Sequence, residues 1–298
     1  MSLDLTEKGT PTIDAAACTG CGLCTRLCPD QMFQLENGKA RVVAGSFLGC
    51  IACGHCVAGC PTDCITVRGR GMTGDDAVTL PPKDSRASAD QLQALLQSRR
   101  SIRRFTPEPV DRATLDRILE ATTTAPMGIP PSDVGVLAFH GRDRVQAFSE
   151  DACAAFARLG WLLHPVTLTL MRPLLGKENH RAMRDFVRPL LQAIVAERAA
   201  GRDDFTYDAP AALLFHYGPE SDGADAHIAA TYAMLAAESL GLGSCMLGTT
   251  AGLSHDKRFK QKYGVPSKNK FGLGLVLGHS QETFQRGVRR RLASVRFA

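Results

Sequence analysis

One cysteine pattern occurs twice in this chain of 298 residues and constrains its folding more than any other feature. The blocks read Cys18-x2-Cys21-x2-Cys24-x3-Cys28-Pro29 and Cys50-x2-Cys53-x2-Cys56-x3-Cys60-Pro61. Three closely spaced thiolates can surround one corner of an iron–sulfur cubane, and in chains with this spacing the fourth thiolate comes from the other block. The pattern therefore predicts two [4Fe-4S] clusters, one held by Cys18, Cys21, Cys24 and Cys60 and the other by Cys50, Cys53, Cys56 and Cys28.

Two other uses of eight cysteines have to be weighed, namely four disulfides or two structural zinc ions. The chain opens without the basic and then apolar segment of an export signal, so we expect reduced thiols and a cytoplasmic location. Zinc sites usually join two separated cysteine pairs, whereas each block here has four cysteines in a row and ends in Cys-Pro. These observations favour clusters. Cys64, Cys153 and Cys245 lack a partner pattern and are expected to be ordinary thiols.

The length and composition fit two domains. Residues 1–70 contain both cysteine blocks, and Asn37-Gly38 between them predicts a hairpin over about residues 32–43. Residues 71–88 are rich in Gly, Pro and polar side chains and are interpreted as a linker. Residues 89–298 are expected to form the larger domain.

The charge is unevenly distributed along the chain. The net charge is +5, yet residues 1–75 carry seven acidic and six basic side chains, so the excess of positive charge lies in the remainder. We expect the basic residues to serve an anionic cofactor, and we expect no nucleic-acid partner. The longest apolar run, residues 159–171, contains His164 and Pro165 and is too short to span a bilayer. No membrane span is predicted.

Apolar periodicity predicts alternating helices and strands in the larger domain. The expected helices begin at about Asp90 and Asp111 and occupy about residues 143–158, 177–199 with a break at Pro189, 224–240, and from Ser254 to Gly264. The expected strands cover residues 134–139, 211–217 and 271–277. This mixture indicates an α+β fold with an α/β sandwich.

Four arginines lie within six residues, Arg99, Arg100, Arg103 and Arg104, and they flank Ser101. Guanidinium groups with a hydroxyl suit a phosphate, and an anion would relieve the repulsion between the positive charges. Taken alone, however, such a run most often faces solvent.

A resemblance to a known family favours the phosphate. The stretch from Arg99 to Phe105, the later Ala125-Pro126-Met127 and the Gly-rich stretch from Leu240 to Gly248 resemble the nitroreductase family of FMN-dependent oxidoreductases over residues 90–291. With the cysteine blocks in front, the whole chain resembles nitroreductases fused to a bacterial-type 2[4Fe-4S] ferredoxin domain. The resemblance implies the nitroreductase-like α/β sandwich and a homodimer, in which the small-residue helix at 224–240 suits the subunit interface.

The resemblance also implies which residues hold FMN. The phosphate and ribityl chain would be held by Arg99, Arg100, Ser101 and Arg103, and the ring would lie against Met246, Leu247 and Gly248. A basic segment near the C-terminus reaches the phosphate in the family, and its nearest equivalents here are Arg286 and Arg290. The family's Asn and Gln-Pro-Trp are absent from residues 126–134, so on that flank we expect contacts only from Pro126, Met127 and Gly128.

Residues 160–205 are interpreted as an insertion, which could be a lid, a dimer contact or ordinary core. No histidine is assigned a catalytic role, since His164, His180 and His216 each lack a partner motif.

Clusters pass single electrons, whereas FMN collects two. The expected function is therefore that of an oxidoreductase that takes electrons from reduced ferredoxin or a similar donor and reduces a nitro compound, quinone or activated alkene. NAD(P)H is an alternative donor. Alternative functions are electron relay to a partner protein, reductive dehalogenation and flavin breakdown.

Overall fold

The computed structural model describes residues 6–45, 47–128 and 132–297, and the chain divides into two compact units. The first unit comprises Met1–Arg86, Met127–Asp133 and Glu220–Asp225. The second comprises Ala87–Pro126, Val134–Pro219 and Ala226–Ala298.

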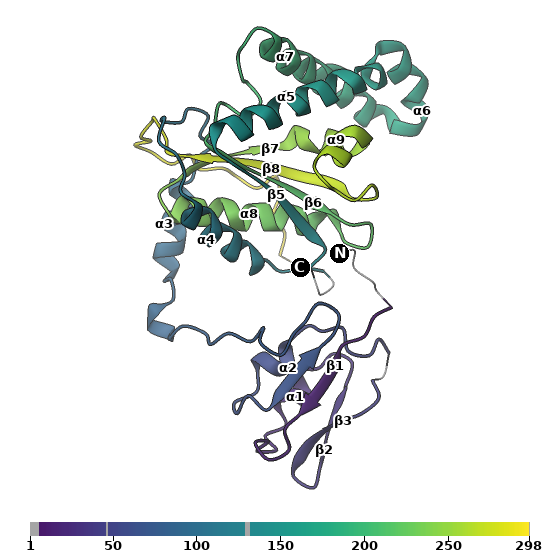
Figure 1. Cartoon of the computed structure of the whole chain (residues 1–298), viewed down its shortest axis with the longest axis vertical. Coiled ribbons are helices and arrows are strands. Elements are labelled where there is room, and N and C mark those ends of the chain that lie inside the picture. Colours follow the sequence, from purple (N-terminus) through teal and green to yellow (C-terminus); the bar gives the residue numbers. More distant parts are fainter. Residues whose placement is uncertain (1–5, 46, 129–131, 298) are drawn as a thin grey trace. The chain divides into compact units, whose positions relative to one another are not determined.

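Among the described residues, the first unit contains two small antiparallel sheets and two short α-helices (Figure 1). Strand β1 (Thr10–Ile13) pairs with β4 (Ile65–Arg68), and β2 (Phe33–Glu36) pairs with β3 (Lys39–Val42). Helices α1 (Leu23–Leu27) and α2 (His55–Ala58) lie within the two cysteine blocks. The predicted hairpin is confirmed: Asn37 and Gly38 have φ values of 50° and 73°, which suit a tight turn between twisted strands.

The second unit is built on an antiparallel sheet with the strand order β5-β6-β8-β7. The strands are β5 (Val134–His140), β6 (Ala211–Tyr217), β7 (Gly243–Leu247) and β8 (Lys270–Gly278). The helical segments are η1 (Lys83–Ser85, in the first unit), α3 (Ala89–Ser98), α4 (Arg112–Thr123), α5 (Arg142–Leu159), η2 (Gly160–Leu163), α6 (Pro165–Ala182), η3 (Met183–Val187), α7 (Arg188–Ala199), α8 (Gly223–Ser239), η4 (Gly248–His255) and α9 (Lys257–Lys262).

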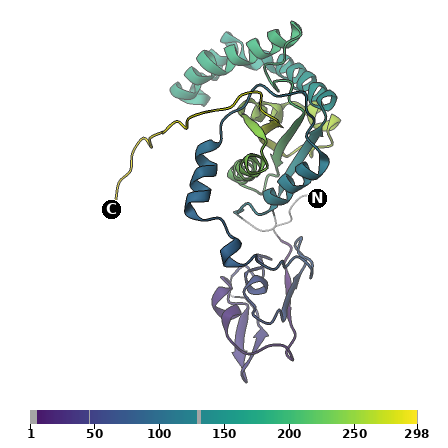
Figure 2. The ribbon, with the colours of Figure 1, turned by 90° about the vertical axis from the view of Figure 1, so that its left-hand side faces the viewer.

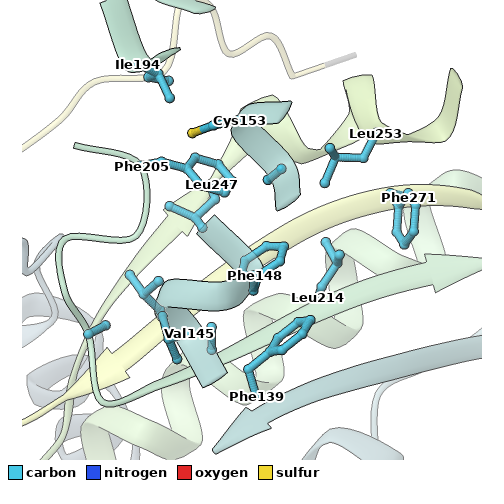
Figure 3. Close-up of a cluster of buried hydrophobic side chains, with 14 of the residues drawn as sticks. Phe139, Val145, Phe148, Cys153, Ile194, Phe205, Leu214, Leu247, Leu253 and Phe271 are labelled. Carbon is cyan, nitrogen blue, oxygen red and sulfur yellow. The ribbon is translucent and has the colours of Figure 1, made fainter. Parts of the chain in front are cut away.

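Helices cover both faces of this sheet, so the expected sandwich is confirmed (Figure 1). Helices α5, α7 and α9 cover one face, where Phe139, Phe148 and Leu214 belong to a large buried cluster (Figure 3). Helices α4 and α8 cover the other face. The alanines of α8 are buried on the sheet side, among them Ala226, Ala230 and Ala233. Its small-residue face therefore packs within one chain, and the expectation that it lies in a subunit interface is wrong for that face.

Three predicted details differ from the structure. Helix α3 begins at Ala89 rather than Asp90, because Ser88 and Gln91 form a reciprocal capping box. The break in the predicted helix 177–199 lies at the π-helical turn η3 and not at Pro189, which occupies the first turn of α7, where a missing N–H costs little. Strands β1, β4 and β7 were absent from the predicted strands, and the Gly-containing sequence of β7 has no alternating pattern.

The segment interpreted as an insertion, residues 160–205, contains η2, α6, η3 and α7. Ile194 of α7 is buried in the main core, whereas Leu170 and Leu174 of α6 are exposed. Within the described ranges no single helix is long and apolar enough to cross a membrane, although one pair of helical segments, bent by 74°, meets that test when the two are taken together.

Beyond β8 the chain continues as an extended segment, residues 281–297, that contains neither helix nor strand (Figure 2). Its apolar side chains are exposed, with Leu292 at 79% and Phe297 at 98%.

Candidate redox and anion sites

The four cysteines predicted for one cluster surround a single cavity in the first unit. Cys18, Cys21 and Cys24 line it together with Cys60 of the other block, and its volume is about 310 Å³ including solvent at its mouth. Cys64 lines the same cavity, with its Sγ 3.4 Å from the Sγ of Cys60. Cys64, which was expected to be an ordinary thiol, therefore lies next to the four predicted cluster ligands.

The other four cysteines surround a second cavity of about 360 Å³. Here Cys50, Cys53 and Cys56 are joined by Cys28 of the first block. Each cavity thus takes three thiols from one block and one from the other, which is the crossed arrangement that the spacing predicts.

The backbone repeats along with the cysteines. Gly20 and Ala52, Gly22 and Gly54, and Gln31 and Asp63 form pairs of equivalent positions in the two blocks, and all six residues have positive φ values. The left-handed residues turn each loop around its cavity. At Gly20 the space is also restricted, since an added Cβ would lie 1.9 Å from the carbonyl oxygen of Gly38.

Backbone amides approach three of the thiols: Ala40 N lies 3.5 Å from Cys18 Sγ, Met32 N lies 3.4 Å from Cys28 Sγ and Cys64 N lies 3.4 Å from Cys60 Sγ. Hydrogen bonds from the backbone of Ala40 and Gly20 lower the pKa of Cys18. Burial raises the pKa of Cys56 to about 12, so this thiol needs the positive charge of a bound metal to ionise near neutral pH.

The geometry fits a cluster better than it fits the alternatives. All eleven cysteines are free thiols. Thiols spaced around a cavity suit a group with several iron atoms, whereas zinc requires ligands that converge on one point.

Asp30 organises the loop before the second block, and sequence reasoning missed it. Its buried carboxylate lines the second cavity and accepts hydrogen bonds from the backbone N–H groups of Phe47 at 2.8 Å, Leu48 at 2.9 Å and Gly49 at 2.7 Å. The position of Asp30 after Cys28-Pro29 gives no signal for partners 17 to 19 residues away.

The arginine-rich segment lies along the edge of β7 in the second unit. Ser101 pairs with Ser244 in a parallel bridge, and Ile102 N donates to Ser244 O at 2.9 Å. A Cβ on Gly243 would lie 2.5 Å from the Ile102 side chain, so this close approach requires glycine.

Three of the predicted cofactor residues meet around the buried thiol of Cys245. Burial raises the pKa of Cys245, while the charge of Arg103, hydrogen bonds with Ser101 and Arg103, and the charge of Arg99 oppose the shift. Among the described residues, no carboxylate forms a salt bridge with Arg99, Arg100 or Arg103, whereas Arg104 pairs with Glu282 at 3.5 Å. Positive charge without a carboxylate partner fits an anion such as the FMN phosphate. We call Arg99, Ser101 and Arg103 the arginine cradle.

The C-terminal segment reaches this region through its backbone. Arg100 Nη2 lies 3.4 Å from the carbonyl oxygen of Arg286, and a Cβ on Gly287 would lie 2.9 Å from the same nitrogen. Arg290 lies further along the same exposed segment.

The residues predicted to lie against the flavin ring are the last two residues of β7, Met246 and Leu247, and the residue after it, Gly248. Leu247 is buried in the core on the α5 side, whereas Met246 packs on the α8 side, so their side chains face opposite ways. A Cβ on Gly248 would meet no atom within 4 Å. A flat ring therefore fits better against the backbone and open space at Gly248 than against the side chains of Met246 and Leu247.

The segment at Pro126, Met127 and Gly128 follows the end of α4. Gly128 N lies 3.1 and 3.3 Å from the carboxylate oxygens of Asp225, which is buried in the first turn of α8. Residues 129–131 of the predicted flank lie outside the described residues.

The unassigned histidines have local contacts. His164 caps α6 through Nδ1, which accepts from Val166 N at 3.4 Å, and His216 Nδ1 lies 3.1 Å from Asn269 Nδ2. His180 lies in the last turn of α6.

Two family models match the chain: the nitroreductase family over residues 96–279 and a 4Fe-4S dicluster domain over residues 10–61. A ferredoxin from Thermococcus litoralis is 40% identical over 57 residues, which cover 19% of this chain and 93% of the ferredoxin. A ferredoxin from Methanothermococcus thermolithotrophicus is 41% identical over 59 residues, which cover 19% of this chain and 95% of the ferredoxin.

Among solved structures, a nitroreductase with bound FMN from Bacteroides fragilis aligns with a TM-score of 0.54 at 19% identity. The alignment covers 70% of this chain and 98% of that protein, and it shows a shared fold.

Proposed function

Since the chain belongs to the nitroreductase family of FMN-dependent oxidoreductases and carries a ferredoxin-type 4Fe-4S dicluster domain, we propose that it takes single electrons through two [4Fe-4S] clusters to FMN and reduces an electron-poor organic acceptor. The observation that carries the proposal is the presence, in one chain, of two four-thiol cavities and an arginine cradle without a carboxylate partner. Nitro compounds, quinones and activated alkenes are the acceptor classes that fit this chemistry.

In this proposal the first unit holds the clusters. Cys18, Cys21, Cys24 and Cys60 are the ligands at one cavity, and Cys28, Cys50, Cys53 and Cys56 are the ligands at the other. Backbone N–H groups such as those of Ala40 and Met32 hydrogen-bond the thiolates and reduce the cost of their negative charge.

The second unit holds FMN through its phosphate. Arg99, Arg100, Ser101 and Arg103 bind the phosphate and ribityl chain, with Arg286 and Arg290 supplying further positive charge, and the backbone around Met246, Leu247 and Gly248 borders the ring. Pro126, Met127 and Gly128 border it on another flank. When bound, the clusters supply electrons singly and FMN pairs them, so that a nitro group takes up two electrons and two protons and yields a nitroso group and water.

The protein's part in this reaction is to bind, orient and exclude water, and no acidic or basic side chain is assigned to proton transfer. We propose reduced ferredoxin or a similar protein as the donor, with NAD(P)H as the alternative, and a cytoplasmic location.

A homodimer is proposed because apolar side chains remain exposed in a single chain. Leu92 and Leu96 of α3 are 48% and 45% exposed, and the extended C-terminal segment exposes Val288 and Leu292. Burial of these surfaces against a second copy would remove them from water.

The electron path is tested by replacing a predicted ligand. Cys53→Ser should leave FMN bound but slow reduction of FMN by a photoreduced ferredoxin about tenfold or more, because one cluster of the path is lost. Anaerobic stopped-flow absorbance measures the rate, and iron analysis measures cluster content. Cys153→Ala is the matched control, since Cys153 is buried in the core of the second unit.

An unchanged FMN reduction rate in Cys53→Ser, together with loss of iron, would contradict the path. If reduced wild-type protein transferred no electrons to nitrobenzene or benzoquinone, reduction of these acceptor classes would be ruled out.

A further inference from the structure

A short turn in the second unit, residues 203–208, contains two strained residues. Tyr207 and Asp208 have φ values of 56° and 50°, in the left-handed region that bulky side chains rarely adopt. Such a conformation persists only where the surroundings hold it, and it often marks a functional position.

A buried carboxylate holds this turn. Asp203 accepts hydrogen bonds from the N–H groups of Phe205 at 3.2 Å, Thr206 at 2.9 Å and Asp208 at 3.3 Å, and from the hydroxyl of Ser149 on α5 at 2.7 Å. The ring of Phe205 packs in the core 5.6 Å from that of Phe148 (Figure 3). The turn is thereby anchored to α5.

Arg142 connects the turn to the strand-like segment that carries the arginine cradle. One guanidinium nitrogen of Arg142 donates to the carbonyl oxygen of Asp208, and the other donates to that of Thr106. Thr106 follows Arg103 by three residues, and its N–H donates to His279 O at 2.8 Å. The Arg142 side chain therefore links the turn to the segment that carries the cradle.

Tyr207 meets Arg103 across this junction. The Arg103 Cζ lies 5.9 Å from the centroid of the half-buried Tyr207 ring, and the guanidinium is also within hydrogen-bonding reach of the phenol. Burial raises the pKa of Tyr207, although the hydrogen bond with Arg103 opposes the shift, so the phenol is neutral at neutral pH. A carboxylate in this place would neutralise Arg103, whereas a neutral ring holds the guanidinium and leaves its charge available.

We propose that Tyr207 is a positioning residue of the anion site, which orients Arg103 toward the phosphate of FMN without neutralising it. This inference rests on the proposed function, because it takes the anion to be the FMN phosphate. Sequence reasoning did not find Tyr207, since no motif links it to a segment about a hundred residues earlier.

The test compares FMN with riboflavin, which has the same ring and no phosphate. In full-length protein freed of flavin under anaerobic conditions, Tyr207→Phe and Tyr207→Leu should weaken FMN binding, by up to about tenfold for Leu, and leave riboflavin binding unchanged. Flavin fluorescence titration gives both dissociation constants. Tyr263→Phe is the matched control, because it removes a hydroxyl that donates to Asp151 and not one that contacts Arg103.

A loss confined to FMN supports the proposal, because a merely structural role would weaken both flavins together. Equal loss for both flavins, or no loss for FMN, overturns it. Arg103→Ala separates this from the proposed function: if that variant keeps the preference for FMN over riboflavin, the anion site itself is misassigned. If Arg103→Ala abolishes the preference while both Tyr207 variants retain it, only the role of Tyr207 is wrong.

Discussion

Single acidic residues fix the loops on which both candidate sites depend. Asp30 gathers three backbone N–H groups beside the second cysteine cavity, and Asp203 gathers three in the turn that carries Tyr207. Asp30 itself lines the second cavity, whereas Asp203 acts through the turn that carries Tyr207. A buried carboxylate is tolerated at each position because hydrogen-bond donors replace the water that it loses.

Asp203 gives a prediction for stability against pH. Burial acts to raise its pKa, but hydrogen bonds from Thr206, Ser149 and Asp208 lower it overall. A lowered folded-state pKa contributes stability that is present above the unfolded pKa of about 3.9 and is lost as the pH falls through the folded pKa. Asp203→Asn should therefore cost on the order of 2 kcal/mol of unfolding free energy at pH 7.

Urea unfolding followed by circular dichroism measures this cost, with the exposed neighbour Asp204→Asn as the control. The difference in unfolding free energy between wild type and Asp203→Asn should be constant from pH 7 to 5 and should decrease only below about pH 4. If the difference in unfolding free energy grew as the pH falls, the folded-state pKa of Asp203 would be raised and not lowered.

At the residue scale, the spacing of the cysteines predicts their grouping, because three of the four predicted ligands at each cavity come from one short motif. The arginine cradle needed a family resemblance, because a run of arginines does not distinguish a phosphate site from a solvated surface. Asp30, Asp203 and Tyr207 escaped prediction because their partners are brought together by folding and not by sequence proximity.

At the element scale, apolar periodicity predicted three of the four strands of the second unit and most of its helices, and the turn sequence predicted the β2–β3 hairpin, whereas β1, β4 and β7 were missed. Strand β6 occupies the predicted residues 211–217, and α4 begins after Asp111 as expected, with the Asp111 carboxylate accepting from Thr114 N at 2.8 Å. Strand β7 was missed because it lies at the seam with the arginine segment, where glycine allows close approach and the alternating pattern is lost. Intrinsic propensity does not report such tertiary contacts.

The loops around the first cavity give a prediction at this scale. Gly20 and Gly38 have nearly equal φ values, 72° and 73°, but only Gly20 is crowded, since an added Cβ would lie 1.9 Å from a carbonyl oxygen. Gly38→Ala should cost about 1 kcal/mol of stability and keep its iron. Gly20→Ala should distort the loop and reduce the iron content toward about four atoms per chain.

Iron analysis and the visible spectrum of both variants provide the measurement. Equal iron content in Gly20→Ala and wild type would show that the loop conformation is not needed for cluster assembly at the first cavity.

At the scale of the whole molecule, two units of different chemistry share one chain. The first unit contains two cysteine loops with the same backbone conformation. The second unit contains the arginine cradle, which has no carboxylate partner among the described residues. A chain with only the first would carry electrons, and a chain with only the second would need another donor. Their fusion is what supports a converter between one-electron and two-electron chemistry.

Both clusters and FMN are proposed to reside in the same chain, so the cofactor composition of the purified protein is the first quantity to measure. Protein purified anaerobically should contain about eight iron atoms, about eight sulfides and about one FMN per chain, with a flavin and iron–sulfur visible spectrum. Clusters without flavin, in protein supplied with excess FMN, would contradict the assignment of the arginine cradle and with it the proposed function.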